Sequence, residues 1–170
     1  TLVQLPFRNR RFELRDVGGG RRLAVEGQHV AFGRNRDPIA VCRAHSWPVE
    51  GYRPPDHPLQ LALVDEVASA AELEPAEVRT GPDGCGVVCF AVPLERAAHV
   101  FSRLGELPGG ERIAAAMRAH PVLIGGEGAT DTALMRAQPG WIAKGGAEGL
   151  MCAGSEDGVG IALKVTDGNS

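Results

Sequence analysis

The residue type that stands out chemically is a lysine, Lys144, followed directly by Gly145 and Gly146. The chain has 18 basic residues, but only Lys144 and Lys164 are lysines and the others are arginines. A guanidinium keeps its proton at any working pH, whereas a partly desolvated lysine can act as a base or hold a carboxylate. The two glycines let a ligand or another backbone come close. The alternative is an ordinary surface lysine at the end of a strand.

A second group of candidate residues lies in the segment Gly-Pro-Asp-Gly-Cys-Gly at positions 81–86. Asp83 stands between proline and glycine, where an aspartate commonly forms a turn. Cys85 offers a thiolate for a metal, although a small buried residue in a tight turn is the alternative. The remaining cysteines show no paired two-residue spacing of a zinc ribbon.

Length and composition are those of one ordinary globular domain of 170 residues, with 44% apolar residues and 23 glycines. No apolar run approaches the roughly 18 residues that a membrane span requires. The sequence does not open on a charged and then apolar signal segment. We therefore expect a cytoplasmic protein without a membrane partner.

The charge distribution divides the chain near position 36. Residues 1–36 contain eight arginines and three acidic residues, whereas the rest of the chain is acidic. We expect residues 1–36 to be a loosely ordered, unassigned segment and residues 37–170 to form the domain. A basic arm could bind nucleic acid, but without interleaved aromatics or a recognisable module we predict no such partner.

Proline, capping and periodicity signals predict the elements that must position these residues. Helices are expected at 37–45, 58–71, 94–107, 111–119 and after a cap formed by Thr130-Asp131-Thr132. The helix at 58–71 is expected to bury Leu59, Leu61, Leu63, Val64, Val67 and Ala71. Strands are expected at 78–80, 87–92, 141–144, 148–153 and 159–165. This order predicts an α/β sandwich with antiparallel strands at the C-terminal end, left incomplete where the sequence stops.

Six short segments occur in a defined order, and the ordered set is a more specific pattern than any single segment. They are Pro55-Asp56-His57-Pro58-Leu59-Gln60, Asp83-Gly84-Cys85-Gly86, Met117-Arg118-Ala119-His120-Pro121, Asp131-Thr132, Ala143-Lys144-Gly145-Gly146-Ala147-Glu148-Gly149 and Gly160-Ile161-Ala162-Leu163-Lys164. Together they resemble the C-terminal half of the asparaginase II family, the rhizobial-type L-asparaginases. The resemblance covers about residues 38–170.

The resemblance implies an activity, a fold and a set of site residues. The family hydrolyses the side-chain amide of asparagine to aspartate and ammonia, on a fold similar to that of serine β-lactamases and glutaminases. It implies a Ser-x-x-Lys nucleophile that faces a Lys-x-Gly strand. On this basis Lys144 is the catalytic candidate, and Asp83, Gly145 and Gly146 are expected to contact the substrate. Cys85 would be one ligand of a zinc site.

Two departures from the family pattern limit what we expect of this chain. Neither lysine has a serine or threonine three residues before it, so the sequence contains no Ser-x-x-Lys. The other zinc ligands should fall at 31–35, where Ala-Phe-Gly-Arg-Asn offers none, which argues against zinc. We therefore expect a fragment that is inactive alone. The alternative is a non-catalytic remnant that binds an amino acid or pairs with another chain, and a homo-oligomer is compatible with either.

Overall fold

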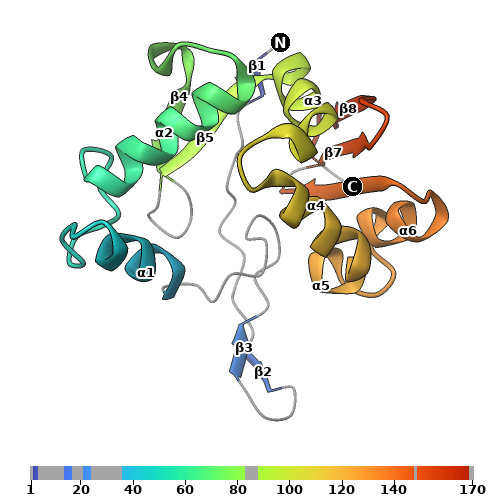
Figure 1. Ribbon diagram of the computed structural model, residues 1–170, viewed down its shortest axis with the longest axis horizontal. Helices are drawn as coiled ribbons and strands as arrows, with labels where there is room; N and C mark the ends of the chain where they lie inside the picture. Colours follow the sequence, from blue (N-terminus) through green and yellow to red (C-terminus); the bar gives the residue numbers. More distant parts are fainter. Residues whose placement is uncertain are drawn as a thin grey trace.

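The computed structural model describes residues 2–3, 14–16, 21–23, 36–82, 88–147 and 149–168. It combines helices with antiparallel sheets, so the predicted mixed α/β class is confirmed. Figure 1 shows α1, α2, β4 and β5 on one side of the molecule and the elements from α3 to β8 on the other. Among the described residues, no helix is long and apolar enough to cross a membrane.

The first side is built on two helices, α1 (Arg36–Ala44) and α2 (Pro58–Ala71). A small apolar cluster joins them and the loop between them; its members are Cys42, Tyr52 and Leu59, with Trp47 and Val49 packed against it. The short 3₁₀ helix η1 (Pro75–Glu77) leads from α2 toward the first strand of the next sheet.

His57 fixes the start of α2. Its Nδ1 accepts the amide hydrogen of Leu59 at 3.1 Å, while Nε2 lies 3.0 Å from the carbonyl oxygen of Pro48. A ring that accepts at Nδ1 and faces a carbonyl at Nε2 is the neutral tautomer with its proton on Nε2. The side chain is buried. Both contacts of His57 therefore serve the local structure at the start of α2.

Two strands near the middle of the chain and one near its beginning form a three-stranded antiparallel sheet in the order β1-β5-β4. The strands are β1 (Leu2–Val3), β5 (Val88–Pro93) and β4 (Arg79–Pro82). A separate antiparallel pair is formed by β2 (Leu14–Asp16) and β3 (Arg21–Leu23). The predicted strands at 78–80 and 87–92 are confirmed with small shifts of their ends.

The helices of the second side follow β5 without a long connection. They are α3 (Leu94–Ser102), the 3₁₀ helix η2 (Leu104–Glu106), α4 (Gly110–Ala119), α5 (Pro121–Gly125) and α6 (Thr130–Ala137). The single helix predicted over 94–107 is thus two elements, because the α-helical hydrogen bonding ends at Ser102.

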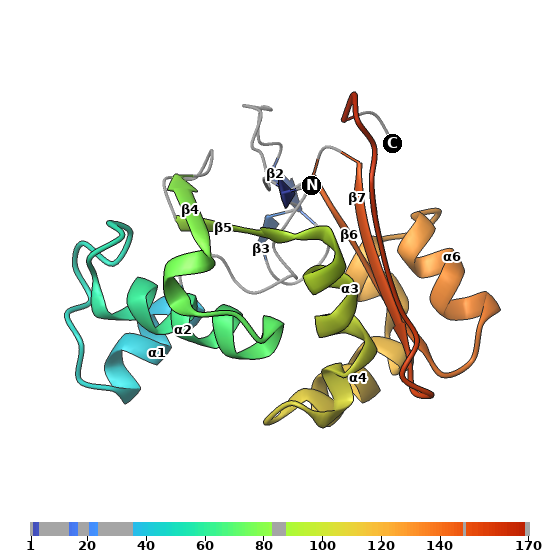
Figure 2. The ribbon, with the colours of Figure 1, turned by 90° about the horizontal axis from the view of Figure 1, so that it is seen from above.

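The second side contains the C-terminal sheet, in which β6 (Trp141–Gly146), β7 (Leu150–Ser155) and β8 (Gly160–Lys164) are antiparallel in the order β6-β7-β8. In Figure 2, α3 and α4 lie on one side of this sheet and α6 on the other. A core cluster connects the layers; it contains Ala114, Met117, Met135, Ile142, Ala143 and Ala153.

Two glycines let α3 lie directly on the sheet. Gly154 and Gly160 are opposite each other in the β7–β8 register. A Cβ on Gly154 would lie 1.9 Å from the carbonyl oxygen of Phe101, and one on Gly160 would lie 2.1 Å from that of Ala98. The close packing of helix backbone on strand backbone therefore depends on these two positions having no side chain.

A charged cluster at the surface connects the two sides of the molecule. Glu72, at the C-terminal cap of α2, places its carboxylate 3.0 Å from Nε2 of His99 and 3.9 Å from Nη1 of Arg96, and it also pairs with Arg103. The spacing of these three partners brings them to one face of α3 and its end. One carboxylate thus ties α2 to α3.

The predicted buried face of α2 is only partly right. Leu59 and Ala71 are buried as expected, but the structure buries Gln60 and Ala68 rather than Leu61 and Leu63. Leu61 is 52% exposed and Leu63 is 37% exposed. Apolar residues of α2 are spread around several of its faces, so the periodicity of the sequence could not identify the face that contacts the neighbouring elements.

Candidate active site

Lys144 lies near the C-terminal end of β6, with Cys152 of β7 directly opposite it in the register. Its side chain is 20% exposed, and its ammonium group donates to the carbonyl oxygen of Gly145. Because side chains alternate along a strand, Lys144 shares a face of β6 with Ile142. Lys144 is therefore a half-buried side chain on the sheet, in contrast to the alternative of a fully solvated surface lysine.

Asp131 is the acidic side chain that faces Lys144. It is 3% exposed, and its Oδ2 accepts the amide hydrogen of Gly145 at 3.1 Å and lies 3.8 Å from Nζ of Lys144. The sequence suggested that Asp131 caps α6, and this is wrong: the capping position is Ala129, which makes no side-chain cap. Asp131 is instead the second residue of α6 and connects that helix to β6.

Burial and the neighbouring carboxylate act on Lys144 in opposite directions. Burial lowers the pKa of the Lys144 ammonium group, and the charge and hydrogen bonding of Asp131 raise it, with burial the stronger effect. The pKa therefore lies below the ordinary value of 10.5. A lysine with a lowered pKa gives up its proton more readily than an exposed one, and a lower pKa favours a role as a general base.

Cys152 does not supply an activated nucleophile beside this lysine. Burial raises the pKa of its thiol to about 11, against an ordinary value of 9.0. The thiolate is the reactive form of cysteine, so near neutral pH this side chain is an unreactive thiol. Thr132, next to Asp131, donates its hydroxyl hydrogen to the carbonyl oxygen of Pro121 at 3.1 Å.

Gly145 and Gly146 follow Lys144 on β6 and complete the Lys-Gly-Gly segment. A Cβ on Gly146 would lie 3.0 Å from the side chain of Leu150, whereas one on Gly145 would make only ordinary contacts. The nearest atom to a Cβ on Gly145 would be Oδ2 of Asp131, at 3.5 Å. A substrate contact by either glycine stays a prediction.

Asp83 and Cys85 lie outside the described residues, so their predicted roles stay predictions. Within the part of the chain that the structure describes, no three histidine, cysteine or acidic side chains come together as a metal site would require. Cys42 and Cys152 are buried, free thiols without such neighbours. The described residues therefore do not supply a zinc ligand set, and we assign no chemical step to a metal.

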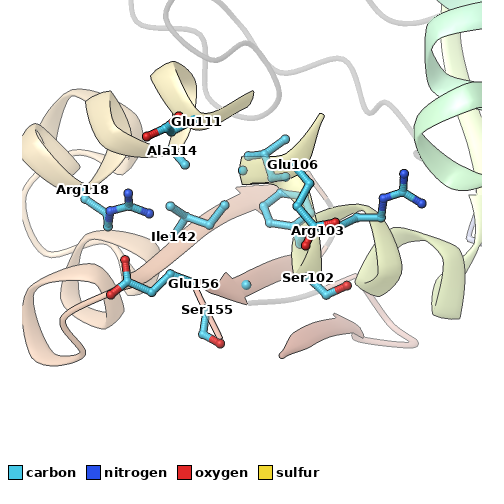
Figure 3. A pocket seen from close by; sticks show the side chains of 13 residues that line it. Ser102, Arg103, Glu106, Glu111, Ala114, Arg118, Ile142, Ser155 and Glu156 are labelled. Atoms are coloured by element: carbon cyan, nitrogen blue, oxygen red, sulfur yellow. The ribbon is translucent and has the colours of Figure 1, made fainter. Parts of the chain in front are cut away.

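A hollow of about 260 Å³ lies between α3, η2, α4 and the strands. Ile142, near the start of β6, is one of the residues that line it. Glu111 and Arg118 of α4 and Glu156 border it (Figure 3). Neither Lys144 nor Asp131 lines it. Its two serines serve local structure, since Ser102 donates to the carbonyl oxygen of His99 at 2.8 Å and Ser155 accepts the amide hydrogen of Val159 at 3.2 Å. We therefore place the candidate site at Lys144.

Comparison with known families gives a match that covers most of the chain. The model of the L-asparaginase II family matches residues 27–170, and the chain belongs to this family. At the family level it is therefore an asparaginase-like amidohydrolase. The match begins somewhat before position 38, where the resemblance seen in the sequence begins. No curated protein matched the chain significantly.

The position of Asp131 beside Lys144 could not be predicted from the sequence. A short polar residue among Thr130 and Thr132, just before a helical pattern, has the local signal of a cap. Its actual partners, Gly145 and Lys144, lie 14 and 13 positions further along the chain. The only available signal was its place among the ordered family segments.

Proposed function

We propose that Lys144 is the functional lysine of a site for hydrolysis of the asparagine side-chain amide, in which asparagine and water give aspartate and ammonia. The observation that carries this proposal is the position of Lys144, half-buried on β6 with a pKa lowered by burial, in a chain of the L-asparaginase II family. Its ammonium group would exchange a proton with the reacting groups or hold a substrate carboxylate.

Binding of the amino acid tests this proposal, because binding does not require turnover. Isothermal titration calorimetry with asparagine and with aspartate should give binding to the unmodified chain and to a Lys164→Met variant. It should give none to Lys144→Met. Lys164 is the matched control because it is the only other lysine of the chain and lies on a different strand. Equal binding by both variants would overturn the assignment of Lys144.

The chemistry of acyl transfer also needs a nucleophile, and we propose that this chain does not supply one of the serine–lysine type. The sequence has no serine or threonine three residues before a lysine, and the thiol opposite Lys144 has a raised pKa. We expect the 170-residue chain to release no ammonia from asparagine above the Lys144→Met background. Release that Lys144→Met abolishes and Lys164→Met preserves would show that this second part is wrong.

A second candidate function is assembly with another copy of this chain, and a specific surface favours it. Ile161 and Leu163 are 48% and 53% exposed, on the face of β8 opposite Gly160 and α3, and Val159, directly before β8, is 50% exposed. In the described sheet β8 is an outer strand, and two outer strands can pair antiparallel around a twofold axis.

Light scattering during size-exclusion chromatography tests this second candidate. A double variant, Ile161→Ser with Leu163→Ser, should convert a dimer to a monomer. The control Leu61→Ser, which removes an equally exposed leucine from α2, should not. A monomeric unmodified chain at all accessible concentrations would exclude assembly through β8.

A further inference from the structure

We propose that Asp131 is the positioning residue of Lys144: one carboxylate holds the ammonium group and the backbone of β6 in a single arrangement. The inference rests on the proposed function only in treating Lys144 as the working lysine. A positioning role differs from a helix-capping role because it acts on a strand 13 to 14 residues away. It therefore makes predictions about β6 that capping would not make.

The burial of Asp131 is the first argument. An aspartate that is 3% exposed must have its charge compensated, because an unpaired buried carboxylate is costly. Oδ1 accepts the amide hydrogen of Thr132 at 2.9 Å, which uses a free amide of the first turn of α6. Oδ2 points at β6 instead, where it accepts the amide hydrogen of Gly145 at 3.1 Å and lies 3.8 Å from Nζ of Lys144.

The hydrogen bond to Gly145 shows what the carboxylate does to the strand. The described sheet ends at β6, so this amide has no strand beside it to accept its hydrogen. Asp131 takes the place of that missing strand at the residue directly after Lys144. The backbone that carries the lysine is thus fixed by the same oxygen atom that faces its ammonium group.

A glycine on α5 supplies the space for the carboxylate, which is the second argument. A Cβ on Gly125 would lie 1.8 Å from Oδ1 and 2.6 Å from Cγ of Asp131. Gly125 does not have a positive φ angle, so its backbone conformation does not require glycine. The absence of a side chain at position 125 therefore serves to admit the carboxylate of Asp131.

Few other charged or titratable groups face Lys144 from the elements that pack on β6. Cys152 lies opposite it on β7, and α5 has no charged residue. Arg118 of α4 lines the hollow beyond the other end of the strand. Among the described residues, Asp131 is accordingly the only acidic group paired with Lys144, and its charge favours the protonated form of the lysine.

The presence of only two lysines makes the test direct. Carbon-13 labelling of lysine gives one Cε signal each for Lys144 and Lys164, and a Lys164→Arg variant assigns them. In the Asp131→Asn variant we expect the titration midpoint of Lys144 to move to lower pH, because the favourable charge is lost. The Lys164 midpoint should stay where it is. Asp157→Asn, which changes an exposed turn aspartate, is the matched control and should move neither signal.

A second variant and a backbone signal keep the test independent of the folding of Asp131→Asn. Gly125→Ala leaves every charge in place but displaces the carboxylate, so it should also lower the Lys144 midpoint. Both variants should shift the amide signal of Gly145, whose hydrogen the carboxylate accepts, and Asp157→Asn should not. A Gly145 amide signal or a Lys144 midpoint that is unchanged in both variants would overturn the proposal.

These measurements need no substrate, so their outcome is separable from that of the proposed function. If the unmodified chain did not bind asparagine, the proposed function would be refuted, and the measured pairing of Asp131 with Lys144 would still stand. An unchanged Lys144 midpoint together with intact binding would refute the positioning role alone.

Discussion

The contact between α3 and the C-terminal sheet yields a sharp prediction, because two glycines leave no space for a side chain. We expect Gly154→Ala and Gly160→Ala to destabilise the fold. The added Cβ would lie 1.9 Å from the carbonyl oxygen of Phe101 in the first variant and 2.1 Å from that of Ala98 in the second. Both clashes are with backbone atoms, so no side-chain rotation can relieve them.

The size of the effect follows from these distances. Ordinary contact begins near 3.4 Å, so α3 and the sheet must separate by about 1.5 Å at Gly154. Overpacking of this kind typically costs about 1–3 kcal/mol of unfolding free energy, and sometimes more. For a chain of this length we expect Tm to fall by roughly 2–12 °C.

Urea denaturation followed by circular dichroism measures this effect, and Gly81→Ala is the matched control. Gly81 also lies in a strand, but a Cβ there would meet nothing within 4 Å. The control should keep the stability of the unmodified chain. If Gly154→Ala and Gly160→Ala were as stable as Gly81→Ala, the packing of α3 directly on β7 and β8 would be refuted.

Further predictions concern titration and two local contacts. The pKa of Lys144 in the folded chain lies below its ordinary value of 10.5, so between these two values the unfolded chain binds more protons than the folded chain. The free energy of unfolding should therefore rise with pH in this range. Urea denaturation at a series of pH values should show the rise, and Lys144→Met should lose it. Cys152 has the opposite sign: with a folded pKa of about 11 against 9.0, stability should fall as pH rises between these values, and Cys152→Ala should abolish the fall in the same experiment. His57→Ala should cost about 0.5–2 kcal/mol through loss of the cap of α2, whereas His120→Ala, at an exposed helix end, should change the denaturation midpoint little. Glu72→Gln should cost less than about 1 kcal/mol, and less again in high salt, because the carboxylate is half-exposed; a large, salt-independent loss would contradict the surface character of that cluster.

The elements of the fold could be predicted largely because their signals are local. The proline after His57, the β-branched run before Pro93 and the Asp157-Gly158 turn each act within a few residues, and the corresponding helix and strands are present. The buried face of α2 could not be predicted, since Leu61 and Leu63 are as apolar as the residues that are buried.

The residues of the candidate site also differ in whether their signal in the sequence is local. Lys144 could be found from its residue type and from the glycines that follow it. Asp131 could not, because its partner on β6 is fixed by the packing of α6 on the strand, and its own neighbours carry the signal of a cap. Gly125, whose missing side chain admits the carboxylate, looks in the sequence like an ordinary helix end.

The spectrum of the labelled lysines can show whether Lys144 is the lysine that contacts the amino acid. Asparagine and aspartate are added in turn to chain labelled with carbon-13 lysine, while the two Cε signals are followed. We expect a saturable shift of the Lys144 signal and no shift of the Lys164 signal. A shift confined to Lys164, or no shift of either signal, would show that Lys144 does not contact the amino acid.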